Sequence, residues 1–166
     1  MVIDEKAATT VGRLILIAAE LDAQLNAVCM EALLVPESHF GLPLVATLDA
    51  PRKIEILKSW AKHLEAENWR KMLTRYAEEA EEVMRLRNIA AHSLYRQEGE
   101  KFTFASLGAA KLLKSIEKPG KAVELAHLDA AFERARATLQ MGEEVYQNFQ
   151  RVRLEMGRRA PAPPVG

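Results

Sequence analysis

The chain contains very little cysteine, since Cys29 is the only one among its 166 residues. A single cysteine excludes an intrachain disulfide and fits a reducing compartment. The neighbours of Cys29 are the apolar residues Val28 and Met30. They predict that its thiol is a small buried side chain rather than a reactive nucleophile.

An excess of positive charge is also absent. Lys and Arg together number 23, and Asp and Glu together also number 23. No global field therefore attracts nucleic acid, and any contact with RNA would need a local basic patch. Two basic stretches are candidates, although solvated surface is the expected interpretation of both: Lys111, Lys114, Lys118 and Lys121, and Arg151, Arg153, Arg158 and Arg159.

Long hydrophobic runs are missing as well. The longest apolar patch extends from Leu14 to Ala19 and is far too short to span a bilayer. The charged N-terminal residues do not resemble a signal peptide. We therefore expect no association with a membrane and a cytoplasmic location.

The sequence lacks the usual motifs for metals and cofactors. It has no His-Glu-x-x-His run, no Walker loop and no dinucleotide-binding glycine pattern. His39, His63 and His127 are scattered and lack the spacing of metal ligands. We expect neither a metal nor a cofactor. A run of four glutamates predicts a solvated helix face more readily than a cation site: Glu78, Glu79, Glu81 and Glu82.

The residues that are present predict helices. Apolar residues recur at alternating steps of three and four, which indicates helices over residues 4–34, 51–66, 69–91 and 125–156. Asp49 is expected to cap the second helix, with Pro51 in its first turn. Trp60 and Trp69 are expected in the core. The apolar sides of the first and last helices are wider than one seam needs, which predicts a homodimer.

Two segments between the helices have a different character. Residues 93–104 carry aromatic residues around Glu98-Gly99 and predict a short β-hairpin. Residues 109–116 fit a helix less clearly, and a turn follows them. The sequence thus predicts an all-α fold, a helical bundle of four long helices with a small β-hairpin after the third helix. We expect a single domain over residues 1–157 and a disordered tail over residues 158–166.

One polar cluster stands out near the end of the third helix, where the chain reads Arg87-Asn88-Ile89-Ala90-Ala91-His92. An arginine can hold a phosphate, and a histidine can transfer a proton. On an ideal helix Arg85, Asn88 and His92 share one face, opposite Val83, Leu86 and Ala90. We therefore expect His92 at the helix end, facing a cleft.

The helical period leaves the functional arginine open. Arg87 lies about 140° around the helix from His92. It would approach His92 only if the helix loosened or if its long side chain reached across, so Arg85 is a rival. A structural interpretation is also possible, in which Arg85 pairs with Glu81 and His92 terminates the helix. We favour Arg87, with Arg85 held by Glu81.

The arginine, asparagine, three further residues and histidine, followed by Ser93, resemble the signature of the HEPN superfamily. The resemblance in layout covers roughly residues 8–156. It includes Glu20-Leu21-Asp22 in the first helix and the entry to the second helix at residues 48–58. The superfamily consists of all-α domains that are usually dimeric, and many members are metal-independent ribonucleases.

The resemblance implies functional roles for three residues. His92 would act as general acid or base, Arg87 would stabilise charge on the phosphate, and Asn88 would orient His92 or hold a phosphate oxygen. Two copies of the segment would meet across a dimer interface, and an antitoxin protein would be a possible partner. The alternative is a non-catalytic dimeric module that binds a nucleotide, RNA or a protein.

Overall fold

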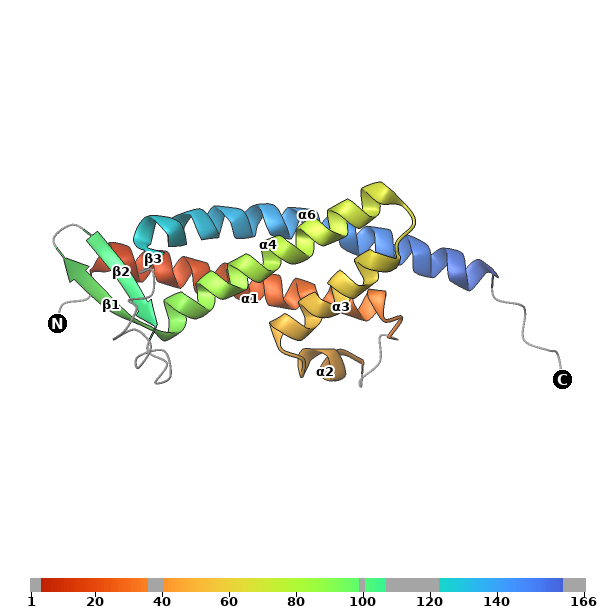
Figure 1. Cartoon of the computed structure of the whole chain (residues 1–166). Coiled ribbons are helices and arrows are strands. Elements are labelled where there is room, and N and C mark those ends of the chain that lie inside the picture. The colour runs from red at the N-terminus through yellow and green to blue at the C-terminus, as the bar shows by residue number, and fades with distance from the viewer. Residues whose placement is uncertain (1–3, 36–40, 99–100, 107–122, 160–166) are drawn as a thin grey trace, which may run out of the picture. The chain divides into compact units, whose positions relative to one another are not determined.

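A computed structural model describes residues 4–35, 41–98, 101–106 and 123–159. Most of these residues are helical (Figure 1), so the prediction of a predominantly helical fold is confirmed. The chain divides into two compact units. The first comprises Met1–Asp22 and Glu78–Thr138, and the second comprises Ala23–Ala77 and Leu139–Gly166. The boundaries between the units fall inside long helices.

Helix α1 spans Glu5–Ala32. It begins where the Asp4 carboxylate accepts a hydrogen bond from the Ala7 amide at 2.9 Å. It ends two residues earlier than the sequence predicts, because Leu34 adopts a left-handed backbone conformation with φ of 53°. The Leu34 amide donates to the Glu31 carbonyl, and the Val35 amide donates to the Met30 carbonyl. These two bonds form a Schellman motif, with a leucine where glycine is usual.

The short helix α2 spans Gly41–Ala46, between the first two of the helices that the sequence predicts. Pro43 is compatible with this helix because it lies in the first turn, where an amide hydrogen has no intrahelical partner. Helix α3 spans Ala50–His63, with Asp49 as its N-cap and Pro51 in its first turn, as predicted. The Asp49 carboxylate accepts from the Arg52 amide at 3.1 Å.

Helix α4 spans Glu67–His92, and α6 spans Leu125–Arg159. Strand β1, Ser93–Glu98, follows α4 directly and pairs antiparallel with β2, Lys101–Ser106 (Figure 1). Strand β3, Val123–Glu124, extends this sheet beside β2. The sequence predicts two strands here, whereas β3 is an addition that its pattern does not indicate. Residues 109–116 and the end of the predicted tail, 160–166, lie outside the described residues.

The core of the first unit is built from three helices and one strand. Its buried side chains lie at helical spacing on α1, α4 and α6, and β2 contributes one aromatic ring: Leu14, Ala18, Leu21, Val83, Leu86, Phe104, Leu128 and Ala135. Polar contacts fix α6 beside α1. Thr10 donates to Asp129 at 2.9 Å, and the Arg13 guanidinium lies 4.0 Å from the centre of the Phe132 ring.

The second unit contains the cysteine and both tryptophans of the chain. Cys29 is fully buried and its thiol lies 3.6 Å from the Lys53 carbonyl, which confirms the expected structural cysteine. Trp60 and Trp69 are half-buried rather than central, and their rings meet Phe149 edge-on. Within the described residues, no helix combines the length and the apolar character needed to cross a membrane.

Two polar contacts secure α6 within this unit. Arg153 donates to the buried carboxylate of Glu31 at 3.1 Å. Gln24 donates to the Leu139 carbonyl at 2.8 Å and accepts from the hydroxyl of Tyr76 at 3.1 Å. Burial raises the pKa of Tyr76 well above its ordinary value, so its hydroxyl stays protonated and can donate this bond.

Candidate functional site

The polar cluster of the sequence lies in the last two turns of α4. His92 is the final residue of the helix and is exposed, while Val83, Leu86 and Ala90 are buried. The helix end and the two opposed faces are therefore as predicted. His92 was also expected to face a cleft, but it lines neither of the two pockets described below.

Arg87 and Asn88 form a pair on this helix end. The Nη1 group of Arg87 donates to the side-chain oxygen of Asn88 at 2.9 Å. The sequence analysis allowed for a loosened helix that would bring Arg87 toward His92, but α4 is α-helical through His92. Any approach of Arg87 to another group must come from its side chain. Asn88 orients this side chain, which is a role that the sequence did not suggest.

One donor of Arg87 has no partner. Its Nε group is buried and makes no hydrogen bond within the described structure. A buried donor without an acceptor costs roughly 1–3 kcal/mol. Such a group calls for an explanation, and a ligand or a partner chain is one of the ordinary explanations.

Arg85 pairs with a different glutamate from the one expected. It donates from Nε and Nη2 to the two carboxylate oxygens of Glu82, each at 2.7 Å, whereas the sequence analysis assigned it to Glu81. The hydrogen bond from Arg85 lowers the pKa of Glu82 below its ordinary value. The same bond raises the pKa of Arg85. Arg85 is thus held on the side of α4 that carries Glu82.

Arg134 of α6 joins the same network from the other side. Its Nε lies 3.0 Å from the Glu79 carboxylate, and its Nη1 lies 3.8 Å from that of Glu82. The glutamate run is therefore more than a solvated helix face, because two of its members bind a neighbouring helix. The described residues contain no group of three or more side chains suited to hold a metal ion.

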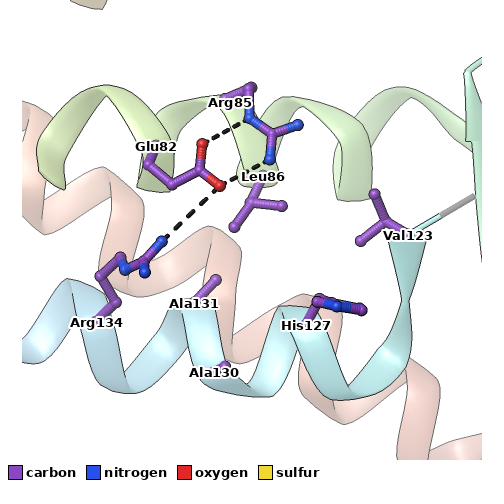
Figure 2. A pocket seen from close by; sticks show the side chains of 8 residues that line it. All are labelled: Glu82, Arg85, Leu86, Val123, His127, Ala130, Ala131 and Arg134. Atoms are coloured by element: carbon purple, nitrogen blue, oxygen red, sulfur yellow. Dashed lines mark hydrogen bonds and ion pairs between the residues drawn. The ribbon is translucent and has the colours of Figure 1, made fainter. Parts of the chain in front are cut away.

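A pocket of about 370 Å³ opens beside this network, between α4 and the beginning of α6. Figure 2 shows Glu82 between Arg85 and Arg134, with His127 on the same side of α6 as Arg134. Apolar side chains complete the lining: Leu86, Val123, Ala130 and Ala131. The spacing of the histidines in the sequence gives His127 no role as a metal ligand. The available signal was its spacing of seven residues from Arg134, which places both on one helix face.

A second pocket, of about 630 Å³, lies between α1 and α6 in the same unit. Thr10, Arg13 and Asp129 line it, but the Thr10 hydroxyl and Asp129 bind each other and Arg13 covers the Phe132 ring. These side chains are occupied in packing the two helices together. This pocket is therefore the weaker candidate for binding a ligand.

Of the two basic stretches of the sequence, the structure describes the side chains of Arg151 and Arg153, and neither lines the two pockets. Arg151 is exposed, whereas Arg153 forms an ion pair with the buried Glu31 carboxylate. Arg158 and Arg159 are the last residues of α6 and not part of the tail that the sequence predicts. The four lysines of the other stretch lie outside the described residues: Lys111, Lys114, Lys118 and Lys121.

Comparisons of the chain with models of protein families, with curated proteins and with solved structures gave no match. The interpretation of the cluster therefore rests on its own geometry and on the resemblance of its motif.

Proposed function

We propose that this chain is a HEPN-like, metal-independent endoribonuclease that acts as a homodimer. Its site would combine Arg87, Asn88 and His92. The observation that carries the proposal is the end of α4, where an oriented Arg87–Asn88 pair lies next to an exposed terminal histidine. A cation, a neutral amide and a proton-transfer group in one short segment are the parts needed for cleaving a phosphodiester.

The chemistry follows from these three side chains. His92 accepts the proton of a ribose 2′-hydroxyl as its oxygen attacks the adjacent phosphorus. The bond from phosphorus to the 5′-oxygen breaks, and that oxygen takes a proton from water. Arg87 stabilises the negative charge that develops on the phosphate oxygens. The products are a 2′,3′-cyclic phosphate and a 5′-hydroxyl, and a DNA strand without the 2′-hydroxyl is not cleaved.

A dimer explains how the arginine and histidine could meet. Within one helix they point about 140° apart, so one chain does not aim both at one phosphate. Arg87 of one protomer and His92 of its partner could converge across a symmetric interface. Leu16 and Ile15 on α1 are 70% and 37% exposed, and such exposed apolar side chains favour a partner surface on the same unit.

The test is RNA cleavage in the presence of a chelator, with a 2′-deoxy strand as the inert substrate. His92→Ala and Arg87→Ala should each lower the rate by about two orders of magnitude or more, as expected for loss of an acid–base group or an electrostatic one. Arg75→Ala, an exposed arginine on the same helix, is the matched control and should cleave normally. Equal cleavage rates for the wild type and the three variants would refute the proposal that this site cleaves RNA.

Mixing the two inactive variants tests the composite site. In a heterodimer of His92→Ala with Arg87→Ala, one site keeps both functional side chains. Random exchange of subunits should therefore restore about a quarter of the wild-type rate. Light scattering at micromolar concentration must report dimers before and after mixing. A dimer that regains no activity would contradict a site made from two chains, and a monomer would remove it altogether.

A second candidate is a non-catalytic HEPN-like dimeric module that binds a nucleotide, RNA or a protein. The balance of 23 basic and 23 acidic residues favours it, because a nuclease gains from attraction to its substrate. A binding assay on the same preparation separates the two, since binding without turnover selects the module. A toxin would also bind an antitoxin protein, which co-purification with the product of a neighbouring gene would reveal.

A further inference from the structure

The pocket between α4 and α6 has the chemistry of an anion site. Arg85 and Arg134 reach it from facing helices, and His127 lies two helical turns from Arg134 on the same face of α6 (Figure 2). Leu86 and Ala131 form an apolar part of its wall and are buried. None of these residues belongs to the proposed cleavage site.

The lining of the pocket holds more basic than acidic side chains. Two guanidinium groups face a single carboxylate, Glu82, among the lining residues, so the lining carries a net positive charge even when His127 is neutral. Outside the lining, Glu79 pairs with Arg134 at 3.0 Å, so the two guanidinium groups and the two carboxylates of the network together carry no net charge. Of the titratable groups that face His127, those from α4 are Glu82 and Arg85, and that from α6 is Arg134.

Both arginines keep hydrogen-bond donors for a further partner. A guanidinium has five N–H bonds, and Arg85 uses two of its five for Glu82. Arg134 lies 3.8 Å from Glu82, an ion pair that is too long for a hydrogen bond. The side chains of Arg85 and Arg134 are 54% and 45% exposed, so a solute can reach them.

We propose that this pocket binds a phosphate group, with Arg134, Arg85 and His127 as donors to its oxygens. Planar guanidinium forks match phosphate oxygens, and an imidazole N–H supplies a third direction. Glu82 holds the two guanidinium groups in place when the pocket is empty and competes with the incoming anion. The volume of about 370 Å³ suits a small ligand or one phosphate of a larger one.

Titration calorimetry of the full chain with inorganic phosphate tests the site. Arg134→Gln should weaken binding at least tenfold, which corresponds to about 1.4 kcal/mol. Arg136→Gln is the matched control, because Arg136 is an exposed arginine on the same helix that pairs with Glu133 and does not line the pocket. Glu82→Gln removes the competing charge and should strengthen binding severalfold. Circular dichroism confirms that each variant is folded.

Three results would overturn the proposal: no phosphate binding at millimolar concentration, equal losses in Arg134→Gln and Arg136→Gln, or weaker binding by Glu82→Gln. The source of the phosphate follows from two further ligands. Tighter binding of adenosine 5′-monophosphate than of an oligodeoxynucleotide identifies a small nucleotide, and the reverse order identifies a nucleic-acid backbone. The outcome is independent of RNA cleavage by His92, because phosphate binding is measured without turnover.

Discussion

Gly142 of α6 offers the sharpest test of packing in the second unit. It is buried, and a Cβ atom at this position would collide with the carboxamide of Gln24 and lie 2.7 Å from Cε2 of Tyr76. Neither neighbour can retreat easily. Gln24 is bound at both ends, to the Leu139 carbonyl and the Tyr76 hydroxyl, and Tyr76 is fully buried. Gly142→Ala therefore forces Gln24 out of its hydrogen bonds.

The expected cost combines three effects. Overpacking of a buried site costs roughly 1–3 kcal/mol. Displacing Gln24 leaves the buried Tyr76 hydroxyl without an acceptor, which costs roughly another 1–3 kcal/mol. The higher helix propensity of alanine offsets this by raising the free energy of unfolding by about 1 kcal/mol. We expect Gly142→Ala to lower the free energy of unfolding by about 3 kcal/mol, or Tm by roughly 6–12 °C for a chain of this length.

Urea and thermal unfolding followed by circular dichroism measure this change. Gly12→Ala is the control, because no atom lies within 4 Å of a Cβ built at Gly12 on α1. It should stabilise the chain by about 0.5–1 kcal/mol through helix propensity alone. In a Gln24→Ala background the cost of Gly142→Ala should fall, since the colliding group is gone. If Gly142→Ala were as stable as Gly12→Ala, the close approach of Gly142 to Gln24 would be refuted.

Two further predictions concern the end of α1 and the acid stability of α4. Leu34→Gly should raise the free energy of unfolding by about 0.5 kcal/mol, because the left-handed backbone costs leucine about 1–2 kcal/mol and glycine almost nothing; Leu33→Gly, at a neighbouring position without positive φ, should lower it. The folded chain lowers the pKa of Glu82, so its contribution is complete above the ordinary glutamate range of about 4.3 and is lost as pH falls through the lowered value. The difference in unfolding free energy between wild type and Glu82→Gln should therefore shrink in acid, and a difference independent of pH would contradict the pairing with Arg85.

The helices were predictable where local chemistry decides them. Asp49 and Pro51 mark the start of α3 in any context, because a cap and a first-turn proline act on their own backbone. The end of α1 could not be placed as well. Its Schellman motif uses Leu34 instead of the glycine that would have signalled it. Pro43 is no clear signal for α2, since proline ends a helix or begins one according to its position.

The contacts around the candidate site depended on tertiary structure. Glu81 and Glu82 are both within helical reach of Arg85, and spacing alone does not choose between them. Glu82 also faces Arg134 on α6, and that contact draws the network to one side of α4. His127 likewise lies beside Glu82 and Arg85 only because α6 packs against α4. A periodic pattern reports one helix at a time, whereas this pocket needs two helices and β3.

The difference between the two arginines lies in the charge of their partners. Arg85 is bound to a carboxylate, so the pair carries little net charge toward any group on α4. Arg87 is bound to the neutral amide of Asn88, which orients the guanidinium without neutralising it. A phosphate that gains negative charge in a transition state is stabilised by the second arrangement more than by the first. Arg87 is therefore the better candidate for cleavage, although Arg85 shares a helix face with His92.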